Sequence, residues 1–150
     1  MEIKEYTKER IEDVLAFERN LRSEEDFWGW EIDENYIASV QNSFKDEKFR
    51  NSLSLLAYIV GKVVGSIDST LICSHFDGSA KAYLDWICVL KSARHQGVAQ
   101  TLMETLRKTL KARFGVETLI ALIAGNPEAQ RFYRSLPNAL IRDEGIWIDL

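Results

Sequence analysis

A single carboxylate stands inside one of the most apolar stretches of the sequence. Asp85 lies in the middle of KAYLDWICVL, residues 81–90, whose composition predicts a β-strand. A carboxylate in such a strand tends to have a raised pKa or a charged partner. Asp85 is therefore a candidate general base, and the alternative is that it pairs with an arginine or caps a loop. Alternation predicts that Cys88 faces away from it and that three residues share its face: Tyr83, Ile87 and Val89.

The next segment, RHQGVAQTL at residues 94–102, opens a predicted helix without a Ser, Thr, Asp or Asn cap. The first turn of a helix has backbone N–H groups without intrahelical acceptors, and the helix dipole adds partial positive charge there. Gly97 removes the side chain that would block a ligand, Ala99 is small, and Arg94 supplies a positive charge. The segment therefore predicts an anion site, and phosphate is a typical occupant of such a site.

Two common phosphate-binding patterns are absent around this segment. A P-loop would end in Gly-Lys-Ser/Thr, and a dinucleotide-binding fold would carry three spaced glycines near its first strand. A single glycine late in the chain satisfies neither pattern, so the segment indicates another kind of fold.

The composition is that of an ordinary globular protein. With 150 residues, 46% of them hydrophobic, the chain predicts a single domain over residues 1–150. The net charge of −4 argues against general nucleic-acid binding, and no apolar run predicts a transmembrane helix or a membrane partner. Cys73 and Cys88 lack the spacing of metal ligands, so we expect no metal site, two buried free thiols and a cytoplasmic location.

Charge is unevenly distributed along the chain. Acidic residues dominate between Glu12 and Glu34, whereas basic residues dominate between Arg94 and Arg113. Most of these charges belong on solvated helix faces, but their separation also fits a basic side for an anionic ligand and an acidic side for a cationic one. Three aromatic residues in the acidic segment form either a lid over a ligand or a packing contact for the next helix: Phe27, Trp28 and Trp30.

The elements that must position these residues alternate between strands and helices, which predicts one α/β domain with a mixed sheet. Strands are predicted over residues 2–7, 53–73 (a hairpin that turns at Gly61-Lys62), 81–90, 116–124, 138–143 and 146–150. Helices are predicted over residues 7–20 with Thr7 as cap, 33–49, 96–113 and 125–136, the last with Asn126 as cap and Pro127 in its first turn.

The segment with Arg94 and Gly97 resembles the Arg/Gln-x-x-Gly-x-Gly/Ala signature of the GNAT superfamily of N-acetyltransferases. DWICVL resembles the fourth strand of that family, ETLIALIAGNPEAQRFYRSL its fifth strand and following helix, and GIWIDL its closing strand. The resemblance covers nearly the whole chain and is strongest over residues 83–133. It implies a central, mixed, mostly antiparallel sheet of about seven strands flanked by about four helices.

The resemblance also implies acetyl-CoA as a co-substrate. The pyrophosphate would lie beside Arg94 on consecutive backbone N–H groups: Gln96, Gly97, Val98, Ala99 and Gln100. The pantetheine arm would pair with the backbone of Ile87 and Val89, where the N–H near Val89 would polarise the thioester carbonyl. Asn126 matches a cofactor contact of the family, although its role as a helix cap explains it as well.

For the chemistry, the resemblance places Tyr133 in the cofactor site, near the leaving sulfur, as the acid that helps the CoA thiolate depart. Tyr133 also fits a helical stripe of core residues with Ala129, Phe132 and Leu136. An alkyl amine is mostly protonated at neutral pH, so a base must remove a proton, and Asp85 is the residue we expect to do so. Other acids on the substrate side are Glu24, Glu25 and Asp26.

The sequence thus predicts an N-acetyltransferase that moves the acetyl group of acetyl-CoA to a primary amine by direct attack. The acidic first third favours a small cationic amine or a peptide amine as acceptor, and the resemblance allows a homodimer. Two alternatives are a CoA-binding sensor or regulatory module without turnover, and an acyltransferase for a longer acyl-CoA.

Overall fold

The computed structural model describes residues 1–25, 31–142, 145–146 and 148–149. The chain divides into two compact units, residues 1–120 and 121–150, and each is described by itself. The aromatic segment with Phe27, Trp28 and Trp30 lies outside the described residues. None of the described helices is long and apolar enough to cross a membrane.

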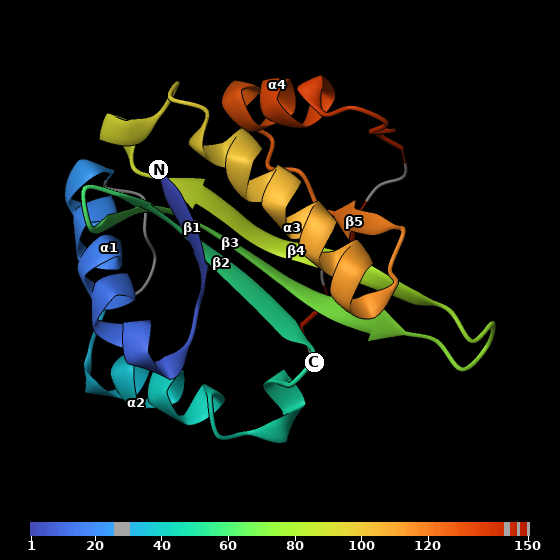
Figure 1. Ribbon diagram of the computed structural model, residues 1–150, viewed down its shortest axis with the longest axis horizontal. Helices are drawn as coiled ribbons and strands as arrows, with labels where there is room; N and C mark the ends of the chain where they lie inside the picture. Colours follow the sequence, from blue (N-terminus) through green and yellow to red (C-terminus); the bar gives the residue numbers. More distant parts are fainter. Residues whose placement is uncertain (26–30, 143–144, 147, 150) are drawn as a thin grey trace. The chain divides into compact units, whose positions relative to one another are not determined.

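A five-stranded sheet with the order β1-β2-β3-β4-β5 forms the centre of the fold (Figure 1). Its strands are β1 (Glu2–Glu5), β2 (Ser52–Ile59), β3 (Lys62–Cys73), β4 (Ala80–Val89) and β5 (Leu119–Ala121). The first four strands are antiparallel neighbours, whereas β5 follows β4 through a helix, which is the connection that joins parallel strands and makes the sheet mixed. The expectation of about seven strands is therefore wrong for the described residues.

The described residues of the first unit form three α-helices: α1 (Ile11–Glu24), α2 (Glu34–Ser43) and α3 (Val98–Phe114). The predicted helix over 33–49 is divided, because Asp46 accepts a hydrogen bond from the Lys48 N–H at 3.0 Å and starts a separate 3-10 turn, Glu47–Phe49. A 3-10 turn, Lys8–Arg10, also precedes α1. The hydroxyl of Thr7 accepts a hydrogen bond from Arg10 at 2.8 Å and does not cap this turn.

The turn between β2 and β3 differs from the prediction by one residue. Ile59 pairs with Lys62, so the two-residue loop is Val60–Gly61, with φ values of 48° and 72°. Two consecutive positive φ angles are the signature of the type I′ turn, whose twist matches that of the flanking strands. Lys62 therefore begins β3.

The two faces of the sheet are covered by different helices in the first unit (Figure 1). On one face, α3 packs five buried residues against the strands: Val98, Leu102, Met103, Leu106 and Leu110. A Cβ at Gly65 would lie 3.0 Å from Val98 Cγ1, so this glycine lets the start of α3 approach the sheet closely. On the other face, α1 buries Val14, Phe17 and Leu21 in one cluster with Leu56 of β2.

The end of the chain contains less strand than predicted. The strand expected over 116–124 is confined to β5, and residues 138–142 form none. The Ala139 N–H instead donates to the Leu136 carbonyl at 3.3 Å, and Asn138 has a φ of 62°, so the chain turns at this point and cannot continue as a strand. Of the predicted strand 146–150, the described residues 146, 148 and 149 are not in a strand.

Candidate active site

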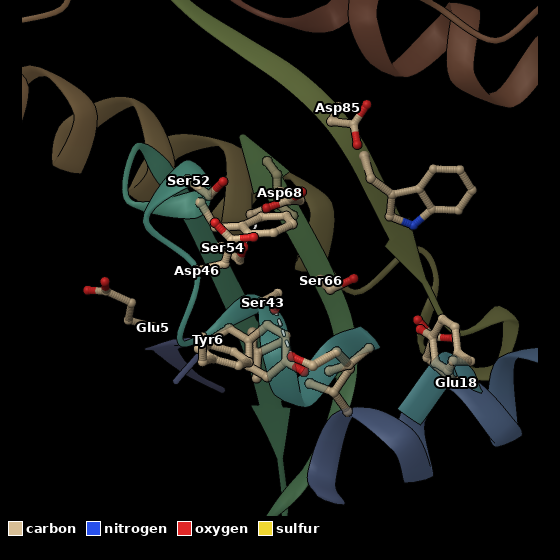
Figure 2. A pocket seen from close by; sticks show the side chains of 18 of the residues that line it. Glu5, Tyr6, Glu18, Ser43, Asp46, Ser52, Ser54, Ser66, Asp68 and Asp85 are labelled. Atoms are coloured by element: carbon tan, nitrogen blue, oxygen red, sulfur yellow. Dashed lines mark hydrogen bonds between the residues drawn. The ribbon is translucent and has the colours of Figure 1, made fainter. Parts of the chain in front are cut away.

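A cleft of about 750 Å³ opens on the face of the sheet that carries α1 and α2 (Figure 2). Its floor consists of residues from three neighbouring strands: Ser52, Ser54, Ser66, Asp68, Asp85, Trp86 and Cys88. Its walls include Glu18 of α1, Tyr36 and Ser43 of α2 and residues of the segment 44–50 that follows α2. Cross-strand pairs in a sheet point to the same face, so the register Ser54–Asp68–Trp86 and Leu56–Ser66–Cys88 explains why these side chains gather here.

A β-bulge in β4 places Asp85 in this cleft. Asp68 pairs with Trp86 and Ser69 pairs with Leu84, so Asp85 has no partner on β3 and two residues oppose one. The bulge reverses the alternation of side chains beyond this point. Asp85 and Trp86 consequently both line the cleft and are both exposed.

The bulge corrects two expectations about β4. Cys88 lines the same cleft as Asp85 and does not face away from it, whereas Ile87 pairs with the fully buried Ile67 on the opposite face. The Cys88 sulfur lies 3.4 Å from the hydroxyl oxygen of Ser66, and burial raises the pKa of the thiol. Cys73 is exposed, so the expectation that both thiols are buried is also wrong.

Asp68 is the acidic residue of this cleft that sequence reasoning missed. It lies on β3, and one carboxylate oxygen, Oδ1, accepts a hydrogen bond from the hydroxyl of Ser54 on β2. Burial and the neighbouring charge of Asp85 raise the pKa of Asp68, and the Ser54 hydrogen bond opposes them. The signal was present in the sequence, because Asp68 interrupts an apolar strand just as Asp85 does.

The lining of the cleft is predominantly acidic. Two basic residues, Lys45 and Arg50, line it together with six carboxylates: Glu5, Glu18, Asp46, Glu47, Asp68 and Asp85. Some of these acids are neutralised locally, since Glu5 binds Arg113 at 2.7 Å and Glu18 binds Arg22 at 2.8 Å. Asp68 and Asp85 form no ion pair with any residue in the described part of the chain. The negative potential of the cleft suits a cationic ligand.

One end of the cleft is aromatic. Tyr6 contacts Phe44 edge-on with ring centroids 5.0 Å apart, and the buried Tyr6 hydroxyl has no hydrogen-bond partner among the described residues. Burial and the nearby charge of Glu18 raise the pKa of Tyr6 and of Tyr36 well above the ordinary value. Both phenols are therefore neutral donors at physiological pH.

Beyond β4, the chain forms the helix start that the sequence predicted. His95 and Gly97 both have left-handed backbone, with φ values of 61° and 77°, and α3 begins at Val98 without a side-chain cap. Thr101 donates the first intrahelical hydrogen bond, to the Gly97 carbonyl at 3.0 Å. The N–H groups of Val98, Ala99 and Gln100 therefore have no acceptor within the helix, as an anion site requires.

Two acids at the end of α1 hold the loop before this helix start. Glu25 forms an ion pair with Arg94, whose Nε also donates to the Val89 carbonyl at 3.4 Å. Glu24 accepts hydrogen bonds from the Ser92 N–H at 3.0 Å and hydroxyl at 2.7 Å, and these bonds lower its pKa. Both acids thus bind the loop and do not line the cleft; Asp26 lies outside the described residues.

The peptide groups near the end of β4 are oriented as pairing with an extended ligand would require. The Leu90 N–H donates to the Val64 carbonyl of β3 at 2.9 Å. Peptide groups alternate in direction along an antiparallel strand, so those of Val89 and Ile87 point away from β3. The Arg94 contact to the Val89 carbonyl agrees with this direction.

Tyr133 and Asn126 belong to the second unit, in and before α4 (Pro127–Ser135). The Asn126 side chain accepts a hydrogen bond from the Ala129 N–H at 2.8 Å and Pro127 begins the helix, which confirms the predicted cap. The ring of Tyr133 contacts that of Phe132 edge-on, with centroids 5.2 Å apart. The structure of this unit by itself leaves the cofactor roles of both residues as predictions.

Comparison with known proteins shows to which family the chain belongs. The sequence model of the acetyltransferase (GNAT) family matches residues 2–136. No curated protein matches the sequence. The fold is similar to that of an aminoglycoside acetyltransferase from an uncultured soil metagenomic sample, with a TM-score of 0.82 at 17% identity, covering 99% of this chain and 95% of that one.

Two further solved structures are similar. A ribosomal-protein-alanine N-acetyltransferase from Brucella melitensis biovar Abortus 2308 has a TM-score of 0.74 at 16% identity, covering 100% of this chain and 99% of that one. The enzyme AAC(6')-Iy, solved with a bisubstrate analog of CoA and acetylneamine, has a TM-score of 0.76 at 18% identity, covering 99% and 97%. With a family match over nearly its whole length, the chain belongs to the GNAT family of acetyltransferases.

Proposed function

We propose that the protein is an N-acetyltransferase that moves the acetyl group of acetyl-CoA to a primary amine of a small cationic molecule or a peptide by direct attack. One observation carries the proposal: β4 combines two sites that this reaction needs. Its bulge presents Asp85 to an acidic cleft, and its end leads into a helix start whose N–H groups have no intrahelical acceptor. Family membership supplies the reaction type.

The residues at the start of α3 fit the pyrophosphate of acetyl-CoA. A Cβ built on Gly97 would meet nothing within 4 Å, so the surface in front of the helix start is open. The unbonded N–H groups and the positive end of the helix dipole attract a phosphate. We assign the anchoring role to the backbone of residues 96–100 and place Arg94 beside it.

The other cofactor contacts predicted from the sequence are assigned to residues of β4 and, in the second unit, of α4. When bound, acetyl-CoA supplies an activated acetyl thioester. The peptide groups of Ile87 and Val89, which point away from β3, are assigned to the pantetheine arm, and the Val89 N–H to the thioester carbonyl. Tyr133 is assigned as the acid for the departing thiolate, and Asn126 as a cofactor contact in addition to its role as cap.

The acidic cleft is assigned to the acceptor. Its carboxylates favour an ammonium group over a neutral or anionic one, and Asp85 lies at the bulge where the cleft meets the strand of the cofactor site. The names of the similar structures include both an aminoglycoside and a ribosomal-protein alanine, which are amine acceptors of different size. A cytoplasmic location and a homodimer remain predictions from the sequence.

Thermal unfolding with and without acetyl-CoA tests the cofactor assignment. A ligand at ~100 times its Kd stabilises the folded state by about 2.7 kcal/mol, which raises the Tm by about 5–10 °C for a chain of this size. The absence of a shift with CoA, acetyl-CoA and longer acyl-CoAs would contradict the proposal.

Release of the CoA thiol across a panel of amines tests turnover. We expect release that depends on a cationic amine and is faster with acetyl-CoA than with longer acyl-CoAs. Tight binding of acetyl-CoA without amine-dependent release would indicate a sensor or regulatory module. Faster release from a longer acyl-CoA would indicate an acyltransferase of different acyl specificity.

A further inference from the structure

The bulge in β4 brings two carboxylates from neighbouring strands into one cleft. Asp68 on β3 pairs with Trp86, and Asp85 is the additional residue that precedes Trp86 on β4. Both line the same cavity, and their charges interact. Figure 2 shows Asp68 beside Ser54, with Asp85 further along the neighbouring strand. Two carboxylates that line one cleft repel each other when both are charged.

The surroundings of the two carboxylates differ. Asp68 is partly buried between β2 and β4 and accepts a hydrogen bond from the Ser54 hydroxyl, whereas Asp85 is exposed. Burial penalises the ionised form of Asp68, and the charge of Asp85 adds to that penalty, so the pKa of Asp68 is raised. The exposed Asp85 carboxylate is in contact with water, which solvates it.

Other charged groups face this cleft as well. The segment after α2 contributes Lys45, Asp46, Glu47 and Arg50, and α1 contributes Glu18. Asp46 is held by Lys48 at 3.3 Å and Glu18 by Arg22 at 2.8 Å. Among these charges, that of Asp85 is the one that raises the pKa of Asp68.

We propose that Asp68 is the general base of the acetyl transfer and that Asp85 is the fixed negative charge that holds the acceptor ammonium and strengthens Asp68 as a base. The inference rests on the proposed function. In this step an N–H bond of the ammonium breaks and an O–H bond forms on a carboxylate oxygen of Asp68, directly or through one water. The products are a neutral amine with a lone pair and a neutral carboxylic acid, which later returns its proton to water.

The division of roles follows from Brønsted behaviour. A base that accepts a proton from an ammonium group works best when its pKa approaches the working pH, provided that it is still ionised. Burial brings Asp68 towards that condition, and exposure keeps Asp85 suited to charge stabilisation. This assignment replaces Asp85, the base expected from the sequence, with its neighbour on β3.

The pH dependence of kcat/KM in three variants distinguishes the two carboxylates. Asp68→Asn should lower kcat/KM by about 100-fold or more and abolish the fall in rate on the acidic side. Asp85→Asn should retain this fall, the acidic limb of the pH profile of kcat/KM, but move it to lower pH. Loss of the neighbouring charge lowers the pKa of Asp68. Ser54→Ala should move the limb to higher pH, because the Ser54 hydrogen bond lowers that pKa.

The opposite shifts of Asp85→Asn and Ser54→Ala give the experiment its control. Both variants retain Asp68, so a common loss of folding or of acceptor binding cannot imitate shifts in opposite directions. If Asp85→Asn loses the fall of kcat/KM at acidic pH and Asp68→Asn retains it, the inference is overturned and Asp85 is the base. An active Asp68→Asn variant with an unchanged profile would also overturn it, while leaving the proposed function intact.

A second measurement does not depend on turnover. Carbon-13 NMR of labelled aspartate carboxyl groups should show Asp68 titrating above the ordinary aspartate range, with its midpoint lowered in Asp85→Asn. Asp77, an exposed turn residue whose carboxylate accepts from the Ser79 N–H, serves as the unaffected control. An ordinary Asp68 titration would overturn the inference. A raised Asp68 midpoint in a protein that acetylates no amine would overturn the proposed function and, with it, the role of Asp68 as base.

Discussion

Glu25, the residue that follows α1, forms an ion pair with Arg94 in the loop between β4 and α3. The pair links the helix that borders the acceptor cleft to the helix start that we assign to the pyrophosphate. The Arg94 side chain is 28% exposed and the Glu25 side chain 14% exposed, so the contact is sheltered from solvent. The positive charge expected to meet the cofactor is thus already engaged within the protein.

This ion pair predicts opposite effects of its two members on cofactor affinity. Arg94→Ala should weaken acetyl-CoA binding, whereas Glu25→Gln should strengthen it about threefold, because the carboxylate no longer competes for the guanidinium. Titration calorimetry with acetyl-CoA measures both. Glu24→Gln is the matched control, since it breaks the neighbouring contact to Ser92 and leaves Arg94 paired. Equal affinities in all three variants would show that Arg94 serves the loop alone.

The glycines at the two ends of α3 provide a second test. Gly97 and Gly115 have φ values of 77° and 65°, and both have open space where a Cβ would lie. Alanine at either position should cost about 1–2 kcal/mol of folding free energy, measured by denaturant unfolding. Only Gly97→Ala should also weaken acetyl-CoA binding, by about tenfold, because its methyl group faces the proposed pyrophosphate. A similar loss in Gly115→Ala would point to a general effect on the helix.

The partly buried carboxylate of Asp68 predicts how stability depends on pH. Its pKa is raised in the folded protein, so the folded state binds more protons than the unfolded state between the ordinary and the raised pKa. The stability that the protonated group contributes is therefore complete below about pH 4 and is lost as the pH rises through the raised pKa. Asp68→Asn should have a higher Tm than the wild type at pH 7.

The difference in Tm between the two proteins should vanish at low pH, where Asp68 is protonated in both states. Calorimetric scans from acidic to neutral pH measure this convergence. Asp77→Asn is the control for a carboxylate whose pKa is lowered, and it should show the opposite sign. A constant difference between wild type and Asp68→Asn across the range would contradict the raised pKa.

Tyr133 provides a test in the second unit. Tyr133→Phe should lower kcat by about 100-fold while leaving the acetyl-CoA affinity nearly unchanged, because the variant lacks only the hydroxyl proposed as the acid. The variant keeps the aromatic ring that contacts Phe132, so packing in α4 is preserved. Turnover equal to that of the wild type would return Tyr133 to a packing role.

The sequence by itself determined the features that depend on neighbouring residues. The uncapped start of α3 at Gly97 and the Asn126 cap of α4 each need only a few consecutive residues, since a positive φ or a side-chain acceptor acts within one turn. The apolar strands and most helix positions were predicted for the same reason. The strands predicted after residue 137 were wrong for the described residues, because the chain turns at Asn138 and a strand also requires a partner.

Tertiary structure decided what lies together in the cleft. The bulge at Asp85 exists only because β3 and β4 pair in a particular register, and it reverses the face of Trp86 and Cys88 that simple alternation predicts. Asp68 becomes important only beside Asp85, and Arg94 meets Glu25 across 69 positions of sequence. Such pairings arise from the packing of distant segments, and no local pattern of residues encodes them.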